Sequence, residues 1–249
     1  MPAEALLSVR GLSKRFGGLL ALAGVDFDVT RGQIFSVIGP NGAGKTTLFS
    51  CLVGSLAPTS GEIRFKGQRI DGLPNHAVVA RGIVRTHQIV RPFREMTVED
   101  NVSIGAHFGA GRRRGKASSR SVDDVLSRTG LLHRRGALAA TLTIGELKRL
   151  EIARALATEP EVLCLDEVMG GLNPGEIQGA MKLIRAIRDS GVTILMIEHH
   201  VHAVAGVSDR LLVLNFGERI AEGPPAEVLR DPEVIVAYLG ADAVPAGER

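Results

Sequence analysis

The stretch that decides the fold is an apolar segment, followed by a glycine-rich turn and a helix-like segment. It reads Gln33-Ile34-Phe35-Ser36-Val37-Ile38-Gly39-Pro40-Asn41-Gly42-Ala43-Gly44-Lys45-Thr46-Thr47-Leu48. The run to Ile38 predicts a buried strand, and the residues from Lys45 to about Val53 favour a helix. The turn between them fits the pattern G-x-x-x-x-G-K-S/T without deviation. This order of strand, turn and helix predicts a phosphate-binding loop.

Each position of the turn has a physical reason. Glycines reach backbone conformations that let several N–H groups point at one anion, and the following helix adds its positive end. Lys45 supplies a mobile charge for the β- and γ-phosphates of ATP, and the Thr46 hydroxyl is placed to coordinate Mg²⁺. The alternative is a turn with a purely structural role. The predicted ATP-binding residues are Gly39, Pro40, Asn41, Gly42, Ala43, Gly44, Lys45, Thr46 and Thr47.

Strands and helices alternate through the remainder of the chain. Strands are predicted at residues 7–9, 25–29, 61–67, 162–165, 192–197, 211–214 and 219–221. Helices are predicted within 97–158, with Thr97 and Ser121 as N-caps, and at 176–190. The rhythm of the second half favours a mainly parallel sheet with helices on both faces.

The expected fold class is therefore α/β. We expect a phosphate-loop NTPase (RecA-like) core with a mainly parallel sheet, an antiparallel β N-terminal arm and an inserted α-helical lobe. All 249 residues are expected to form a single domain. Within it, residues 1–90 and 160–249 form the α/β core with its β arm, and residues 91–159 form the helical lobe.

Composition limits the class of protein. Apolar residues make up 45% and charged residues 23%, as in ordinary folded proteins. No run approaches the ~20 apolar residues that a membrane-spanning helix needs, and the N-terminus lacks the features of a secretion signal. These features predict a cytoplasmic protein. Cys51 and Cys164 both lie in apolar patterns and are expected to be buried thiols.

Charge gives little support for a nucleic-acid partner, because the formal net charge is only +3. A local basic cluster covers residues 112–116 between glycine-rich and serine-rich residues. It favours a solvated loop, and contact with anionic lipid or RNA is the alternative.

Two carboxylates follow a predicted buried strand. Val162-Leu163-Cys164-Leu165 is followed by Asp166 and Glu167. Ligands of open α/β sheets bind beyond the carboxyl ends of strands, so Asp166 suits Mg²⁺ and Glu167 suits the attacking water. Helix capping or a surface position is the alternative for such a pair.

The segment Leu142-Thr143-Ile144-Gly145-Glu146 narrows the class of NTPase. It resembles the L-S-G-G-Q signature of ABC (ATP-binding cassette) ATPases. Thr143, Gly145 and Glu146 are accordingly predicted to contact ATP. Thr143 and Glu146 also fit a capping box, and both roles are compatible, because a capped helix N-terminus still presents N–H groups to a phosphate.

Other landmarks of the ABC family follow in the right order. Gln88, in Thr86-His87-Gln88, resembles the glutamine that links Mg²⁺ to the helical lobe, and residues 171–174 resemble the D-loop. His199 looks like the switch histidine that senses the γ-phosphate, and Phe16 falls where the family stacks an aromatic ring on adenine. By this resemblance the catalytic residues are Glu167, His199, Lys45 and Gln88, and the Mg²⁺ ligands are Thr46, Gln88 and Asp166.

The match is closest to the ATPase subunits of branched-chain amino acid importers. The resembling stretches include residues 15–19, 93–98, 149–154 and 231–240. The resemblance implies two permease subunits, a second ABC ATPase subunit and, indirectly, an external solute-binding protein as partners. It implies a cytoplasmic subunit held peripherally on the inner face of the plasma (inner) membrane. Branched-chain amino acids or related small polar solutes are the implied cargo.

Several positions depart from the strict family pattern. Ile144 and Glu146 replace a glycine and the glutamine of the signature, and Val168 stands in place of a proline. Asn173 replaces the aspartate of the D-loop, and His200 follows the switch histidine. These are subtype features of the resemblance. The carboxylate of Glu146 bears on the hydrolysis rate, because it introduces a negative charge at a position expected next to phosphate.

Three alternatives remain for the function. The chain could serve a lipid or lipopolysaccharide transporter, act as a soluble ABC ATPase on DNA or ribosomes, or be a non-hydrolysing regulatory subunit. His199, His200 and His202 raise the separate possibility of a zinc site, but no carboxylate or thiol cluster in the sequence nearby completes a tetrahedral set.

Overall fold

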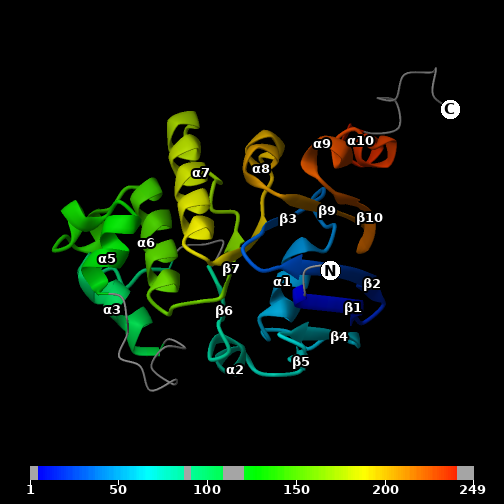
Figure 1. Ribbon diagram of the computed structural model, residues 1–249, viewed down its shortest axis with the longest axis horizontal. Coiled ribbons are helices and arrows are strands. Elements are labelled where there is room, and N and C mark those ends of the chain that lie inside the picture. The colour runs from blue at the N-terminus through cyan, green and yellow to red at the C-terminus, as the bar shows by residue number, and fades with distance from the viewer. Residues whose placement is uncertain (1–4, 87–90, 109–120, 240–249) are drawn as a thin grey trace. The chain divides into compact units, whose positions relative to one another are not determined.

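The computed structural model describes residues 5–86, 91–108 and 121–239. The chain forms two compact units, one of Met1–Pro74 with Leu195–Arg249 and one of Asn75–Ile194 (Figure 1). These bounds differ from the predicted lobes, because the strands around residues 83–85 and 162–166 group with the helices between them. The division of the chain into a nucleotide-binding core and a signature lobe stays a prediction.

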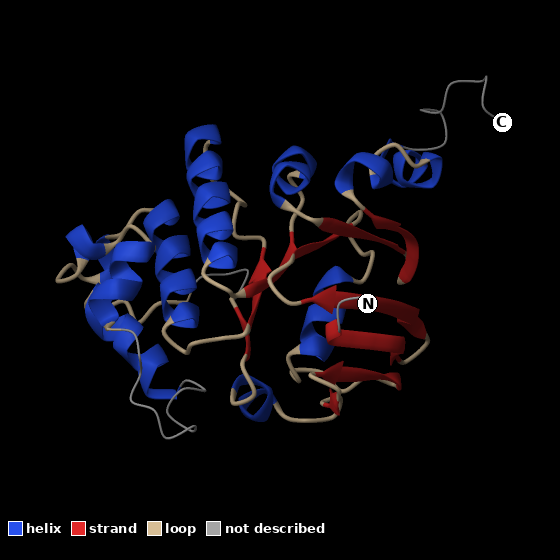
Figure 2. Cartoon of the chain, viewed as in Figure 1, coloured by secondary structure: helices blue, strands red, loops and turns tan. Residues whose placement is uncertain are grey.

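An antiparallel sheet forms the N-terminal part of the first unit. It consists of β1 (Ala5–Phe16), β2 (Leu19–Thr30), β4 (Ser60–Phe65) and β5 (Gln68–Arg69), in the order β2-β1-β4-β5. These strands are labelled in Figure 1, and strands are drawn in red in Figure 2. Leu7 and Val9 of β1 are buried while Ser8 between them is partly exposed, as expected for a sheet with one face on the core. The predicted β arm is therefore confirmed.

A second group of strands completes this unit. β3 (Ile34–Ile38) pairs in parallel with β9 (Arg210–Asn215), and β10 (Glu218–Gly223) pairs antiparallel with β9. β8 (Thr193–Ile197) adjoins β3 and runs through the boundary of the units. All five residues of β3 are buried, as is typical of a parallel strand covered on both faces. The helices of this unit are α1 (Lys45–Leu52), α8 (Val201–Val207), α9 (Pro225–Val228) and α10 (Pro232–Leu239).

The second unit is mainly helical. Its strands β6 (Ile83–Arg85) and β7 (Val162–Asp166) pair in parallel. The α-helices described in it are α2 (Asn75–Val79), α3 (Val98–Phe108), α5 (Val122–Arg128), α6 (Ile144–Leu156) and α7 (Pro174–Asp189), with 3-10 turns at Leu132–Arg134 and Ala139–Thr141. Val102 of α3 and Leu150 and Ala153 of α6 are fully buried, which places the core of the helical part along these two helices.

Side-chain caps fix several helix starts in this unit. The Thr97 hydroxyl accepts a hydrogen bond from the N–H of Asp100 at 3.1 Å, and the Ser121 hydroxyl accepts one from the N–H of Asp124 at 3.1 Å. Both are the N-caps that the sequence predicts. The structure thus confirms these two helix boundaries.

Three further observations concern the predictions from composition. Within the described ranges, no helix is both long enough and apolar enough to cross a membrane. Cys51 and Cys164 are both free and buried, as predicted. The basic cluster at 112–116 lies outside the described residues.

Candidate functional site

The glycine-rich turn joins β3 to α1, as predicted. Gly44 is the N-cap of α1, with φ of +101° and no side-chain cap. A Cβ atom at Gly44 would lie 2.5 Å from the carbonyl oxygen of Ala21, so only glycine fits here. The first N–H groups of a helix have no partner within it, and no side chain caps them at α1. This helix start is therefore suited to bind an anion.

Lys45 lies inside this turn. Its side chain is buried, and its Nζ donates hydrogen bonds to the carbonyl oxygens of Gly39 at 2.6 Å and Pro40 at 2.9 Å. These two bonds hold the ammonium group within the curve of the loop. Thr46 is exposed and Thr47 is partly exposed in the first turn of α1. The arrangement agrees with the charge and the hydroxyl that a nucleotide phosphate requires.

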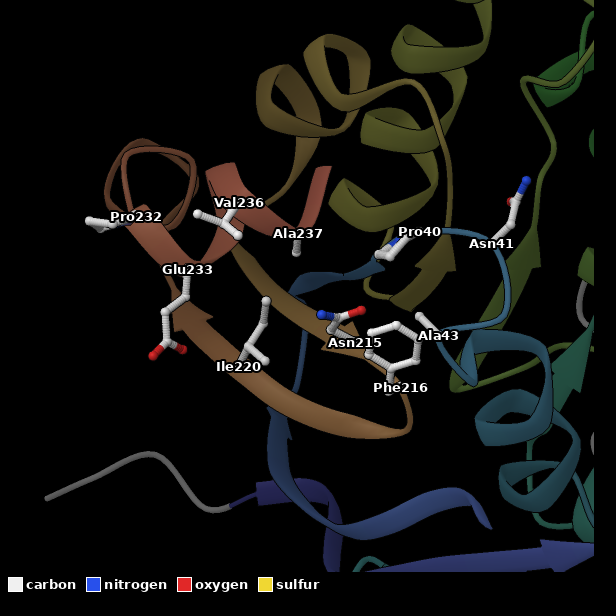
Figure 3. A pocket seen from close by; sticks show the side chains of 10 residues that line it. All are labelled: Pro40, Asn41, Ala43, Asn215, Phe216, Ile220, Pro232, Glu233, Val236 and Ala237. Carbon is white, nitrogen blue, oxygen red and sulfur yellow. The ribbon is translucent and has the colours of Figure 1, made fainter. Parts of the chain in front are cut away.

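A hollow of about 840 Å³ borders one side of the loop. It is lined by Pro40, Asn41 and Ala43, by residues of β9, β10 and the turn between them, and by one face of α10 (Figure 3). Phe216, at the turn between β9 and β10, is 84% exposed and lies beside Asn215 and Ala43. Three of the predicted ATP-binding residues, Pro40, Asn41 and Ala43, therefore line the hollow, whereas Lys45 and Thr46 do not.

The predicted adenine-stacking residue lies at the end of β1. Phe16 is 44% exposed, which leaves ring surface for a planar partner. The Nζ of Lys14 lies 5.1 Å from the centre of the Phe16 ring. A cation at this distance is attracted to the ring. The stacking role itself stays a prediction.

The predicted switch histidine, His199, follows β8 after one residue, Glu198. His199 and its neighbours His200 and His202 are all exposed. No group of three metal-binding side chains is found among the residues that the structure describes, so these histidines give no support to a zinc site. His200 is the N-cap residue of α8 without a side-chain cap bond.

Asp166 ends β7 and is buried. One carboxylate oxygen, Oδ2, pairs with the guanidinium of Arg85 at the end of β6. The other oxygen, Oδ1, is buried without a hydrogen-bond partner among the described residues. A buried carboxylate oxygen that lacks a donor suits a cation or a cation-bound water. This observation fits the predicted role of Asp166 toward Mg²⁺.

Glu167 follows in an unusual backbone conformation. Its φ is +50°, in the left-handed region that costs a residue with a Cβ about 1–2 kcal/mol. Its carbonyl oxygen accepts hydrogen bonds from the Nζ of Lys148 at 2.7 Å and from the N–H of Gly170 at 3.3 Å. Strained backbone of this kind is concentrated at functional sites, which agrees with the predicted role of Glu167.

The signature segment begins α6 with a capping box. Thr143 Oγ1 accepts a hydrogen bond from the N–H of Glu146 at 3.3 Å, and Glu146 Oε2 accepts one from the N–H of Thr143 at 2.9 Å. Glu146 Oε1 lies 3.2 Å from Nε of Arg134 and 3.9 Å from Nε2 of His133. The negative charge that replaces a neutral glutamine is therefore paired within its own unit.

The predicted D-loop continues into α7. Asn173 is the N-cap of that helix, with hydrogen bonds of 2.9 Å from the N–H of Glu176 to Asn173 Oδ1 and from the N–H of Asn173 to Glu176 Oε2. Asparagine caps a helix as well as aspartate does, which explains this departure from the family pattern. A Cβ atom at Gly145 would lie 2.7 Å from Glu176 Oε1, so the signature glycine packs against the start of α7. Val168 is buried and lines the same hollow as Gly145 and Glu176.

The predicted site residues fall into two groups. The first unit holds Phe16, His199 and the loop with Lys45 to Thr47, and the second unit holds Asp166, Glu167 and the signature residues Thr143 to Glu146. Gln88 lies outside the described residues.

Three further residues next to the site were not found from the sequence: Arg85, Arg134 and Lys148. Arg85 directly precedes the Thr86-His87-Gln88 segment. Its basic side chain at the end of a strand is the one feature of the sequence that indicates a place near the site. Lys148 belongs to a basic stretch of α6, but no spacing rule links it to Glu167. Arg134 lies in a 3-10 turn that no pattern predicted.

Comparison with known proteins identifies the family. The ABC transporter family model matches residues 22–170, and a model described as branched-chain amino acid ATP-binding cassette transporter matches residues 218–244. The chain is 44% identical to the high-affinity branched-chain amino acid transport ATP-binding protein LivG of Escherichia coli (strain K12), over 95% of this chain and 98% of that protein. It is 43% identical to BraF of Pseudomonas aeruginosa, a protein of the same description, over 94% of this chain and 98% of that one.

A solved structure agrees with this relationship. The ADP conformation of an ATP-binding cassette of an ABC transporter superposes with a TM-score of 0.86 and 31% identity, over 96% of this chain and 100% of that chain. The match confirms the predicted α/β fold class. With its intact phosphate loop, this chain is an ATP-hydrolysing ATP-binding cassette and belongs to the ABC transporter family.

Proposed function

We propose that this chain is the ATP-hydrolysing motor subunit of an importer for branched-chain amino acids. The observation that carries the proposal is the 44% identity to LivG of Escherichia coli over nearly the full length of both chains. The match of residues 218–244 to the branched-chain amino acid cassette model supports the same subtype. Related small polar solutes are the alternative cargo.

In this function the glycine-rich loop binds the phosphates of ATP. The uncapped start of α1 presents N–H groups to them, and Lys45 stabilises the charge that develops on the γ-phosphate. The ring of Phe16 stacks on the adenine. We assign nucleotide contacts from the signature side to Thr143, Gly145 and Glu146.

Hydrolysis requires a water molecule oriented for in-line attack on the γ-phosphate. We assign this task to Glu167, which accepts a proton from the water, and we assign charge stabilisation in the transition state to His199. Thr46, Gln88 and Asp166 would hold Mg²⁺. The cation neutralises charge on the β- and γ-phosphate oxygens when it is bound.

The subunit would work in an assembly. We infer that two cassettes close on ATP head to tail, with the signature of each facing the phosphate loop of the other, and that hydrolysis reopens them. The movement would drive two permease subunits, which receive solute from an external binding protein. The chain would thus be peripheral on the inner face of the plasma (inner) membrane.

A substitution at Glu167 tests the enzymatic part of the proposal. Glu167→Gln keeps the shape of the side chain but cannot accept the proton, so hydrolysis should fall by at least ~100-fold while ATP still binds. The control is Glu227→Gln, at an exposed carboxylate of α9. Hydrolysis by Glu167→Gln at the rate of the parent chain would refute the assignment.

The same variant tests the transport part. Tagged Glu167→Gln, trapped with ATP in native membranes, should co-purify with two permeases and a cassette subunit. Vesicles that contain the assembled complex should then take up radiolabelled leucine with the parent chain and not with the variant. Recovery of soluble partners alone would contradict transport, and uptake of small amides in place of leucine would favour the alternative cargo.

A further inference from the structure

We propose that Lys148 is a positioning residue that connects the signature helix to the catalytic glutamate of the same chain. The inference rests on the proposed function, because it assumes that Glu167 acts on the attacking water. It concerns a residue that does not belong to the phosphate loop, the acidic strand end or the signature segment. The proposal is based on the 2.7 Å hydrogen bond from Lys148 Nζ to the carbonyl oxygen of Glu167.

The bond joins two elements that are far apart in the chain. Lys148 lies in the first half of α6, two residues after the signature residue Glu146. Glu167 directly follows β7, 19 residues after Lys148 in the chain. Both residues belong to the same unit, and Lys148 is partly buried, so the contact is an internal one. Movement of α6 therefore acts on the backbone of Glu167.

The backbone of Glu167 needs support from outside. A residue with a Cβ atom rarely holds φ of +50° unless its surroundings determine that conformation. The N–H of Gly170 donates to the same carbonyl oxygen at 3.3 Å, which is a longer and weaker contact. The hydrogen bond from the charged amine of Lys148 is shorter, and it is also stronger because its donor is ionised. It fixes the direction of the peptide group and, with it, the direction of the Glu167 side chain.

Packing at the start of α6 also joins this helix to α7. Gly145 lies so close to Glu176 of α7 that a Cβ atom could not be added without displacing the carboxylate. A hollow of about 300 Å³ lies beside this contact, and Lys148, Val168 and Leu172 are among the residues that line it. The side chain of Lys148 therefore has space in which to follow a shift of α6.

The hydrogen bond between Lys148 and Glu167 couples the two ATP sites of a closed pair of cassettes. In the proposed assembly, the signature of one chain meets the nucleotide of the partner, whereas Glu167 acts on the nucleotide of its own chain. When the signature of this chain contacts the nucleotide of the partner, Lys148 transmits the resulting shift of α6 to Glu167. Hydrolysis at one site becomes sensitive to occupation of the other, which is a coupling between sites.

The test compares two substitutions at Lys148 with a control. Lys148→Met keeps the length of the side chain and removes the donor, whereas Lys148→Arg keeps a donor and its charge. Lys182→Met, at an exposed lysine of α7, is the control. The measurements are Mg²⁺-dependent ATP hydrolysis as a function of ATP concentration, and equilibrium binding of ATP.

We expect kcat of Lys148→Met to fall about tenfold, with KM and ATP binding changed by less than about twofold, because the lost bond orients the base and does not hold the nucleotide. The Hill coefficient for ATP should fall toward one. Lys148→Arg should recover at least about half of kcat, and Lys182→Met should behave as the parent chain. In the background of Glu167→Gln, Lys148→Met should add little to the loss, because both changes act on one group.

Three results would overturn the inference: an unchanged kcat in Lys148→Met, an equal loss in Lys148→Arg, or a loss of ATP binding that accounts for the whole effect. Hydrolysis by the parent chain and its absence in Glu167→Gln test the proposed function separately. Those two results stand whether or not the Lys148 assignment is right.

Discussion

The carboxylate of Glu146 is paired with the guanidinium of Arg134, with 3.2 Å between Oε1 and Nε. Arg134 also donates from Nη2 to the carbonyl oxygen of Thr141 at 3.2 Å, just before the signature segment. Arginine is suited to such a double contact because its planar group carries several fixed donors. The pair explains how a glutamate can replace the signature glutamine while its charge is balanced.

Removal of Arg134 should therefore expose the charge of Glu146. Arg134→Leu is expected to lower kcat/KM for ATP about fivefold, which corresponds to about 1 kcal/mol for a partly exposed ion pair. Glu146→Gln should by itself have a smaller effect, because glutamine can still cap the helix. The double variant should recover most of the activity, and steady-state ATP hydrolysis measures all three. An additive loss in the double variant would contradict the charge-balance explanation.

Substitution of Arg85 should destabilise the protein most strongly when no Mg²⁺ is present. Arg85→Met leaves the buried carboxylate of Asp166 without its cation, which is expected to lower the free energy of unfolding by about 3 kcal/mol. Addition of Mg²⁺ and ATP should therefore raise the free energy of unfolding of Arg85→Met by more than it raises that of the parent chain. Thermal unfolding with and without the ligands measures the difference, with the exposed Arg94→Met as the control. If Mg²⁺ and ATP stabilised Arg85→Met and the parent chain equally, Arg85 and the cation would not share Asp166 as a partner.

Two glycines with positive φ, +55° at Gly17 and +101° at Gly44, differ in the space around an added Cβ atom. Gly17 has φ of +55° and nothing within 4 Å of an added Cβ atom, whereas a Cβ atom at Gly44 would meet the Ala21 carbonyl oxygen. Gly17→Ala should cost about 1–2 kcal/mol from backbone strain alone. Gly44→Ala should cost several kcal/mol more and abolish ATP binding, because the loop must open. Chemical denaturation and nucleotide titration test this order, and equal costs would show that the loop relaxes freely.

Alkaline pH should reduce stability through the two thiols. Burial raises the pKa of Cys164 from its ordinary 9.0 to about 12 and that of Cys51 to about 11. Well below pH 9 both thiols are protonated whether the chain is folded or unfolded. As pH rises above 9, only the unfolded chain ionises them, so the free energy of unfolding falls.

Denaturation at pH 8 and at pH 10.5 measures this effect against the variant Cys51→Ala/Cys164→Ala, whose loss of stability should be smaller. At pH 8 the folded protein should also resist iodoacetamide, because only the thiolate reacts and both side chains are buried. Alkylation of the folded chain as fast as of the unfolded chain would contradict the burial.

The sequence alone determined the local features. The glycine pattern at residues 39–46 predicts a phosphate loop, because only glycine permits the backbone conformation that turns N–H groups toward an anion. Alternation of apolar residues predicts the β arm, and Thr97 and Ser121 predict helix starts, since these are interactions between residues a few positions apart. The functional roles of the acidic pair and of the signature segment are predicted for the same reason. Each is a short pattern whose chemistry is complete in a few consecutive residues.

Only the tertiary structure decided which distant side chains meet. Arg85 reaches Asp166 because β6 and β7 pair in parallel with Arg85 opposite Cys164, and no pattern in one strand states which strand lies beside it. Lys148 reaches Glu167, and Arg134 reaches Glu146, through turns and helix packing that depend on the whole unit. The exposure of Phe216 and the left-handed backbone of Glu167 also follow from the surroundings. These contacts come from long-range packing, in which a residue's partner is set by the path of the chain and not by its neighbours in sequence.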